Sequence, residues 1–399
     1  MNKNIILFDD PATRDNLLPL SFTRPLADLR VGITTIKTKW QHVVGGTYSY
    51  LTVDYLSKKF PVTPADNSLY VAGNVCPSYD PAFAEAIDHL QPGDALFADD
   101  TMVAYRGNRQ GFDNRAISRR FQWDGKLVVI NWLYDIFGFN GQQIAADFAI
   151  VDKSDSTALS PTNRLIGPET DSEGNPMIYI APGASVEGAI INTTAGPVFI
   201  GEHAEIMEGS CLRGPIAVCR HGVVNMGTKI YPATTIGPWS KVGGELNNVV
   251  ITGYSNKAHD GFLGNAVLGE WCNLGAGCVA SNLKNDYTPI KLWNYPAHRF
   301  LKTGLQFCGL IMGDHSKAGI NTMFNTATVV GVGVNVHGAG FPRNFIPSFS
   351  EGGTAGFSDV SMTKFFDIAS RVMARRGKKL TDDDIQIFES IYQTAENYK

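Results

Sequence analysis

The chain has 399 residues, of which 44% are hydrophobic and 18% charged, and its formal net charge is −4. This length and an ordinary apolar fraction predict a globular protein of two domains with a tail. The sequence has no block of Lys and Arg and no apolar run of eighteen residues, which argues against a nucleic-acid partner and against a membrane span.

The first residues, MNKNIILFDDP, contain a short apolar run that ends at two aspartates, which is typical of neither a signal peptide nor an anchor. The six cysteines form no C-x-x-C pair. Reduced, mostly buried thiols and a cytoplasmic location are therefore expected.

Strands alternate with helices in the first half of the chain, which predicts an α/β domain over residues 1–153 with a mostly parallel sheet. Short apolar runs that stop at turn residues predict the strands. An Asp cap followed by Pro predicts one helix, and a long aromatic-rich segment predicts one or two more. The expected strands are Asn4–Phe8, Leu69–Ala72, Ala95–Ala98 and Met102–Tyr105, and the expected helices lie in Asp80–Leu90 and Ile130–Phe148.

A segment rich in Ser, Thr, Asn, Pro and Gly follows, and we expect residues 154–177 to be a linker. From Ile200 onward, an apolar residue recurs at every sixth position. Period six fits neither a helix nor a simple strand; it predicts a parallel β-helix over residues 178–357. The first series is Ile200, Ile206, Leu212, Val218, Val224, Ile230, Ile236 and Val242; the others are Phe262, Leu268, Leu274 and then Met312, Ala318, Phe324, Val330, Val336.

The six-residue register breaks twice, after Val242 and again across residues 280–303. Breaks in a solenoid usually map to loops on one face, so we expect two insertions that carry the function. Cys272 and Cys278 lie six residues apart and are expected to be buried thiols on neighbouring faces, the alternative being a zinc site. The repeat ends after Gly356, and residues 358–399 are expected to be a helical tail, with helices over 362–375 and 381–398.

Residues 255–266, SNKAHDGFLGNA, precede the coil LGEWCNLGAG and the turn SNLK. In this order the elements resemble the bifunctional sugar-1-phosphate nucleotidyltransferase/glucosamine-1-phosphate N-acetyltransferase family, in its alternative bacterial and archaeal-like branch. The resemblance implies a left-handed β-helix, a homotrimer and acetyl-CoA bound between neighbouring β-helices. It also implies synthesis of a UDP-N-acetylglucosamine type of sugar nucleotide for the cell wall.

Acetyl transfer to a sugar amine needs a base, and an imidazole, which titrates near ~6.5, can serve at neutral pH. The resemblance implies that His259 is this base. The sugar phosphate would be held by Asn273 together with Lys257 and Lys241. Acetyl-CoA would be held by Ala276, Gly277, Asn282 and Lys284. The alternative for His259 is a surface-loop histidine beside Asp260.

Two departures from the family pattern affect the expected substrate. Phe262 stands where the family has Tyr, which removes a hydroxyl. Gly243 stands where the family has an Arg that holds the sugar phosphate, so Lys241 is expected to substitute for it. The acceptor is therefore an amino-sugar phosphate that need not be glucosamine 1-phosphate.

The first half resembles the nucleotidyltransferase part of this family, with a Rossmann-like fold. Residues 6–14, ILFDDPATR, replace a glycine-rich I-L-A-A-G-x-G-T-R loop, in which backbone N–H groups surround the phosphates of a nucleoside triphosphate. Arg14, Arg24 and Arg30 are the expected nucleotide-binding cations, with structural ion pairs as the alternative. Asn74 stands where the family has the Asp that binds Mg²⁺.

The sequence thus favours an acetyl-CoA-dependent N-acetyltransferase fused to a nucleotidyltransferase-like domain. One alternative is a nucleotidyltransferase whose β-helix serves only for trimerisation. Another is a non-catalytic trimer that binds a sugar nucleotide, favoured by the loss of the glycine-rich loop.

Overall fold

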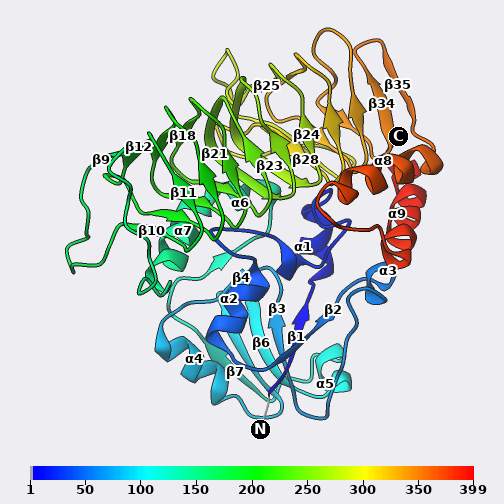
Figure 1. Ribbon diagram of the computed structural model, residues 1–399. Coiled ribbons are helices and arrows are strands. Elements are labelled where there is room, and N and C mark those ends of the chain that lie inside the picture. The colour runs from blue at the N-terminus through cyan, green and yellow to red at the C-terminus, as the bar shows by residue number, and fades with distance from the viewer. Residues whose placement is uncertain (1–2) are drawn as a thin grey trace. The chain divides into compact units, whose positions relative to one another are not determined.

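The computed structural model describes residues 3–399 and contains two compact units (Figure 1). The first unit comprises residues 1–17, 23–30 and 34–132, and the second comprises residues 18–22, 31–33 and 133–399. The fold class expected from the sequence is confirmed: an α/β domain, a parallel β-helix and terminal helices.

A six-stranded sheet forms the core of the first unit, in the order β2-β1-β3-β6-β5-β7. Its strands are β1 (Asn4–Phe8), β2 (Thr47–Leu51), β3 (Ser68–Ala72), β5 (Asp94–Ala98), β6 (Thr101–Gly107) and β7 (Arg119–Gln122), and a second small sheet pairs β4 (Val75–Cys76) with β8 (Val128–Val129). The helices are α1 (Pro11–Asn16), η1 (Leu26–Asp28), α2 (Ile36–Val43), α3 (Asp54–Ser57), α4 (Pro81–Asp88) and α5 (Arg109–Asp113).

This sheet is mostly parallel, as the sequence suggested, with one strand reversed. Strand β6 runs antiparallel to both β3 and β5, while the other three pairs are parallel. Only Asp99 and Asp100 separate β5 from β6. A two-residue connection can join only antiparallel neighbours, so the short spacing between β5 and β6 explains why β6 is reversed.

The second unit is built around the β-helix, whose coils are visible side by side in Figure 1. Ile200 pairs with Val218 and Val218 with Ile236, so a regular coil is eighteen residues, or three hexads. The whole first series, the whole third series, Leu268 and Leu274 are buried in one apolar core, which confirms the period-six prediction. The strands up to β20 are β9 (Arg164–Ile166), β10 (Ile178–Ile180), β11 (Ser185–Val186), β12 (Ile190–Asn192), β13 (Val198–Ile200), β14 (Glu205–Ile206), β15 (Cys211–Arg213), β16 (Ile216–Val218), β17 (Val223–Val224), β18 (Lys229–Tyr231), β19 (Thr234–Ile236) and β20 (Lys241–Val242).

The later coils continue the same pairing. Their strands are β21 (Glu245–Gly253), β22 (Asn256–Lys257), β23 (Phe262–Glu270), β24 (Asn273–Leu274), β25 (Val279–Ala280), β28 (Ile311–Met312), β29 (Lys317–Ala318), β30 (Met323–Phe324), β31 (Val329–Val330), β32 (Asn335–Val336), β33 (Phe345–Ile346), β34 (Ser350–Gly353) and β35 (Gly356–Asp359). The last two strands form an antiparallel hairpin at the end of one sheet.

The first expected insertion is wrong, because the chain does not leave the β-helix after Val242. Val242 pairs with Lys257, only fifteen residues later, so this coil is three residues shorter than a regular one. The next coil is seventeen residues long, since Leu246 pairs with Leu263. The shift buries Leu263 and leaves Phe262, which the six-residue count predicted to face inward, only half-buried.

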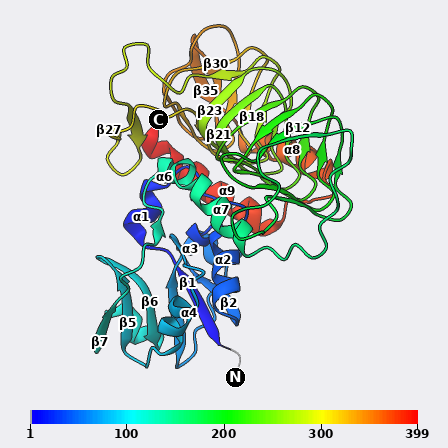
Figure 2. The ribbon, with the colours of Figure 1, turned by 90° about the vertical axis from the view of Figure 1, so that its left-hand side faces the viewer.

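The second expected insertion is present. Between β25 and β28 the chain leaves the coils and forms an antiparallel hairpin of β26 (Lys291–Asn294) and β27 (Arg299–Lys302). In Figure 2 this segment projects beside the coils. Its Trp293 ring stacks on Phe345 of β33, with 4.1 Å between ring centroids, which ties the insertion to the last coils.

Two helices before the β-helix belong to the second unit, α6 (Leu133–Gly138) and α7 (Asn140–Ala149). Ile144 and Phe148 of α7 pack in a small apolar cluster with Ile33, Tyr179 and Ala217. Strand β9 lies within the segment expected to be a linker and pairs with β12. The compact unit thus begins well before residue 154, because α7 buries an apolar face there.

The helical tail is confirmed as α8 (Met362–Ala374) and α9 (Asp382–Ala395), followed by η2 (Glu396–Tyr398). Thr381 caps α9 in a reciprocal capping box with Asp384, as the acidic run after a threonine predicted. Phe365 of α8 contacts Phe349 and His315 of the late coils edge-on. In residues 3–399, no helix is long and apolar enough to cross a membrane.

Candidate functional sites

The expected acetyl-transfer residues gather where two consecutive turns stack. Strand β22 leads into the turn that carries His259 and Asp260, and β24 leads into the turn of Ala276 and Gly277. The Gly277 N–H donates to the Asp260 carbonyl at 3.0 Å, so the two turns are in direct contact. Asn273 pairs with Asn256 on the strands that precede these turns.

His259 is exposed at the tip of its turn, and its backbone is supported from beneath by Lys257. Lys257 is 1% exposed and occupies the inward position between Val242 and Leu274. Its Nζ donates to the carbonyls of Gly243 at 3.0 Å and His259 at 2.9 Å. Burial lowers the pKa of Lys257 to about 8.

The sequence assigned Lys257 to the substrate, whereas the structure encloses its ammonium among main-chain carbonyls inside the β-helix. The reason is the shortened coil, which moves the residue at this position from the outer face to the core. Lys241, one coil earlier, remains exposed and pairs with Asn256 on the outer row. Of the two lysines, Lys241 alone is accessible from solvent.

Gly243 explains the missing family arginine in physical terms. A Cβ at this position would lie 2.4 Å from the Ala258 carbonyl oxygen and 3.2 Å from the His259 nitrogen. The His259 turn of the next coil lies directly against Gly243, so no side chain fits at this position.

Asn273 is exposed and borders a cavity of about 250 Å³ between the coils and α8. We call it the α8 cavity; its lining residues are Tyr254, Asn256, Trp271, Cys272, Asn273, Lys317, Val372, Arg375 and Arg376. Three of them are cations that the sequence interpretation did not select. Arg375 and Arg376 lie at the C-terminal end of this helix, where cations ordinarily complement the helix dipole. Only the packing of α8 reveals that they line the cavity.

The remaining coenzyme candidates, Asn282 and Lys284, lie in the loop that follows β25. Asn282 donates its amide to Asn265 Oδ1 at 2.8 Å. Lys284 lines a cavity of about 680 Å³ with Asn325, Asn344, Asp286 and the half-exposed Phe341, among others. His259 lines neither this cavity nor the α8 cavity. Within one chain, these residues are therefore not brought together with the imidazole.

The turn of Ala276 and Gly277 has little open space. A Cβ at Gly277 would lie 2.1 Å from Asn321 Oδ1, so the next coil already occupies the space beside this glycine. The Ala276 carbonyl accepts the Asn321 N–H at 2.7 Å. Both expected coenzyme contacts are thus engaged in stacking within the β-helix.

The cysteines are free and most are buried. The Sγ atoms of Cys272 and Cys278 donate to the carbonyls of Gly313 and Gly319 at 3.2 and 3.0 Å. No group of three or more His, Cys, Asp or Glu in residues 3–399 could hold a metal ion. The two thiols are core residues, as the sequence favoured, and the zinc alternative is not supported.

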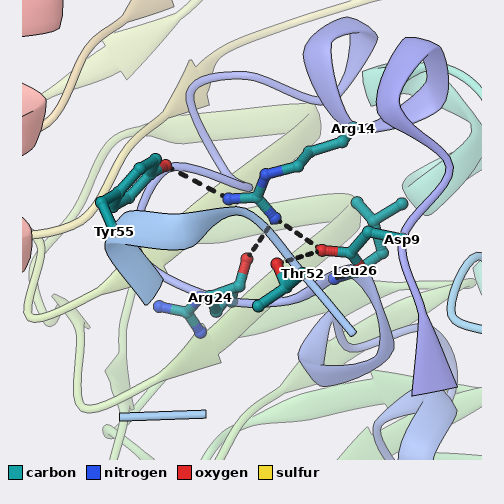
Figure 3. A network of polar contacts seen from close by, with 6 residues as sticks. All are labelled: Asp9, Arg14, Arg24, Leu26, Thr52 and Tyr55. Atoms are coloured by element: carbon teal, nitrogen blue, oxygen red, sulfur yellow. Dashed lines mark hydrogen bonds and ion pairs between the residues drawn. The ribbon is translucent and has the colours of Figure 1, made fainter. Parts of the chain in front are cut away.

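In the first unit, Arg14 points into the protein (Figure 3). Its guanidinium pairs with Asp9 at 2.8 Å and donates to the Arg24 carbonyl at 3.0 Å and to Tyr55 Oη at 3.2 Å. Both partners of the ion pair are 3% exposed. Burial raises the pKa of the Asp9 carboxyl, and the Arg14 charge opposes that rise. The structure thus gives Arg14 the alternative role considered for it, a structural ion pair.

Arg24 is also buried, and its guanidinium lies near the Thr23 hydroxyl. Arg30 is half-exposed and forms an isolated bridge with Thr35. Neither Arg14, Arg24 nor Arg30 lines the cavity of this unit, which has about 270 Å³ and is bordered by Asp10, Thr13, Asn74, Asp100 and Arg115, among others. Arg115 is the cation that the sequence interpretation missed there.

The segment that replaces the glycine-rich loop is a short helix, not an open phosphate cradle. Asp10 caps α1, and its carboxylate accepts the Thr13 N–H at 2.9 Å, with Pro11 at the first turn. A carboxylate of the chain itself thus occupies a backbone N–H that a glycine-rich loop would offer to phosphate.

The donor set does not fit a resident Mg²⁺. The Asp9 carboxylate accepts from Arg14, Thr52 and the Leu26 N–H. The Asp10 carboxylate caps α1, and Asn74 is a buried neutral amide whose Nδ2 lies 3.4 Å from the Ile130 carbonyl. Mg²⁺ prefers carboxylates with room for water, and these carboxylates are already engaged.

Comparison with known proteins agrees with both halves of this description. Residues 5–156 match the family model described as sugar nucleotidyl transferase. A bifunctional sugar-1-phosphate nucleotidylyltransferase/acetyltransferase of Sulfurisphaera tokodaii is 28% identical over 36% of this chain and 35% of its own length. A putative uncharacterized acetyltransferase of Escherichia coli is 26% identical over 35% of this chain and 61% of its own.

The bifunctional protein GlmU of Synechococcus elongatus is 24% identical over 49% of this chain and 39% of its own length. Each alignment thus spans less than two thirds of the relative. Residues 5–156 are thus similar to sugar nucleotidyl transferases, and distant homologues of the chain are bifunctional sugar-1-phosphate nucleotidylyltransferase/acetyltransferases.

Proposed function

We propose that the protein is an acetyl-CoA-dependent N-acetyltransferase that acts on an amino-sugar phosphate. One observation carries the proposal: an exposed His259 lies on a turn whose backbone is held by Lys257 and packed against the next turn, and Asn273 lies on the strand that leads into that next turn. The likeness to relatives named as acetyltransferases supports it.

In this proposal His259 acts as a general base. Its neutral imidazole takes a proton from the sugar amine as the amine nitrogen forms a bond to the acetyl carbonyl carbon. The C–S bond of the thioester then breaks, and the thiolate that leaves takes up a proton. Asn273 orients the acceptor, and the fixed backbone beneath His259 limits the freedom of the imidazole.

Coenzyme binding is assigned to the cavity of Lys284, which is larger and more open than the Ala276 turn. Because His259 does not line the cavity of Lys284, we propose a homotrimer in which one chain supplies the base and its neighbour the coenzyme site. Light scattering after gel filtration would measure three times the mass of one chain, 43.4 kDa. A monomer with full activity would contradict the shared site.

The function is tested by His259→Ala, with release of thiol from acetyl-CoA measured across a panel of amino-sugar phosphates. Loss of a general base lowers kcat about 10²- to 10⁴-fold. The matched control is His337→Ala, since His337 is an exposed residue in the turn after β32 on the same corner of the β-helix. Unchanged acetyl transfer in His259→Ala would refute His259 as the base, and absence of acetyl transfer in the wild-type chain would leave the β-helix as a trimerisation module.

A second function is proposed for the first unit: it binds a sugar nucleotide without transferring a nucleotidyl group. The match of residues 5–156 to the sugar nucleotidyl transferase family supports binding, and the Asp10 cap, the Asp9–Arg14 pair and the amide of Asn74 argue against nucleotidyl transfer. Calorimetric titration with UTP and with UDP-N-acetylglucosamine, each with and without Mg²⁺, is expected to show binding of the sugar nucleotide. Release of pyrophosphate from UTP and a sugar 1-phosphate would contradict the proposal and restore the nucleotidyltransferase function.

A further inference from the structure

The α8 cavity contains positive charge that the β-helix alone does not supply. Lys317 comes from β29, and Arg375 and Arg376 come from the end of α8. Among residues 3–399, no Asp or Glu lines this cavity. The nearby Asp314 accepts the Glu270 N–H at 2.8 Å and is not a lining residue. Three cations around one small hollow favour an anionic ligand.

Two buried polar atoms at the cavity have no hydrogen-bond partner, Arg376 Nε and Asn256 Oδ1. Asn256 reaches only Asn273 through its other amide atom, at 3.5 Å. A buried donor without a partner is costly, and the same holds for a buried acceptor. Arg376 Nε is a donor on a cation, and Asn256 Oδ1 is an acceptor. A ligand that satisfies both must therefore carry an anionic oxygen and also an N–H or O–H group.

A structural role accounts for only part of this arrangement. Cations at the end of α8 complement the helix dipole, as Arg371 also does from the exposed side of the helix. The dipole explains the charge there but not the burial of Arg376 Nε beside a cavity. Lys317 is on another element, and its Nζ donates to the His315 carbonyl at 2.8 Å.

The remaining wall is aromatic. Trp271 is 7% exposed and stacks on Tyr254, with 4.3 Å between ring centroids. A flat aromatic surface next to polar groups suits the C–H face of a sugar ring. The volume of about 250 Å³ is below the range for drug-sized ligands and suits a monosaccharide.

We propose that the α8 cavity binds a phosphomonoester, with Arg375 and Arg376 on the phosphate and Asn256 on a hydroxyl or amine of the ligand. The cavity would thereby supply the cation that cannot stand at Gly243. The phosphomonoester is that of the acceptor sugar in the acetyl transfer proposed above, and this assignment of the ligand rests on that proposal. Coenzyme A carries a phosphomonoester of the same chemistry at its ribose 3′ position.

The experiment is isothermal titration of the full chain and of the double variant Arg375→Gln/Arg376→Gln. Four probes distinguish the acceptor sugar from coenzyme A as the carrier of the phosphomonoester: glucosamine 1-phosphate, glucosamine, coenzyme A and dephospho-coenzyme A. In the double variant, loss of charge-assisted hydrogen bonds is expected to weaken the binding of glucosamine 1-phosphate about tenfold or more, whereas the binding of glucosamine is expected to be unchanged. Arg371→Gln is the control, because Arg371 lies on the same helix with its side chain 78% exposed.

Weaker binding of coenzyme A, with dephospho-coenzyme A unchanged, would also support the phosphomonoester site and assign it to the coenzyme. If the double variant unfolds at the wild-type temperature and binds both phosphomonoesters as tightly as the wild type does, the proposal that the α8 cavity binds a phosphomonoester is refuted. Because His259→Ala removes the base but not the cavity, it is expected to bind the sugar phosphate normally. In the wild-type chain, failure of acetyl transfer with intact binding of the sugar phosphate would refute the proposed function alone.

Discussion

Lys257 shows how one residue can look functional in the sequence and prove structural in the fold. It lies in a motif that resembles a substrate site, yet its Nζ is directed at two main-chain carbonyls in the β-helix core. The ammonium has lost water and gained only neutral acceptors, so burial is the main reason why its pKa falls to about 8. In the structure Lys257 holds the His259 carbonyl in place.

This burial predicts a pH dependence of stability. The folded state releases the Lys257 proton near pH 8, whereas the unfolded chain keeps it up to about pH 10.4. Between these values the unfolded state binds more protons, so the free energy of unfolding rises with pH through this window. Below about pH 8 the cost of burying the charge is fully present.

The test compares urea unfolding of the wild-type chain and of Lys257→Met from pH 7.5 to 10.5. The wild-type midpoint is expected to rise relative to that of the variant as the pH increases. Lys241→Met is the control, since Lys241 is exposed on the adjacent coil. Parallel pH profiles for the wild type and Lys257→Met would mean that this ammonium is not desolvated.

At the scale of elements, predictions succeeded where a local pattern determines the structure. Period six determines which side chains face inward, and the core contains nearly all of them. The threonine and acids before α9 provide a capping box whose geometry needs no distant partner. Strand β1 and helix α4 likewise follow from an apolar run and from an Asp-Pro start.

Predictions failed where the outcome depends on elements far apart in the sequence. A break in the hexads indicates that a coil is irregular, but an insertion and a shortened turn leave the same gap in the pattern. The pairing of Val242 with Lys257 decides between them. Arg375 and Arg376 were missed because α8 reaches Trp271 and Asn273 only through tertiary packing. The sequence left two roles open for Arg14, because its ion pair with Asp9 belongs to a network that includes Thr52 and Tyr55, which are distant in the sequence.

At the scale of the whole molecule, the compact unit around the β-helix takes segments from three separate parts of the chain. Asn140 of α7 accepts the Gly32 N–H at 2.7 Å and donates to the Ala233 carbonyl at 2.7 Å. Asp147 accepts the Ile33 N–H at 2.8 Å. Asn140 and Asp147 are buried next to Ile144 and Phe148 on the same helix, and together they join residues 31–33 to the coils of the β-helix.

Fragments that begin at different residues test this division of the chain. A fragment of residues 154–399 lacks α6, α7 and residues 31–33, and would expose Tyr179, Ala181 and Ala217. We expect it to aggregate, because an apolar patch is uncovered. A fragment of residues 133–399 keeps both helices, and its soluble yield and hydrogen exchange are expected to fall between those of the shorter fragment and of the full chain. Equal behaviour of the two fragments would contradict a structural role for α6 and α7.

The contact between Gly243 and the His259 turn also restricts how this protein could change its substrate. A point mutation to arginine at residue 243 would drive a side chain into the Ala258 carbonyl, 2.4 Å from the position of its Cβ. An arginine at residue 243 would therefore require the backbone of Ala258 and His259 to move away. A single substitution at this position would thus disturb the turn that carries His259, so that any change of substrate through residue 243 would also displace the proposed base.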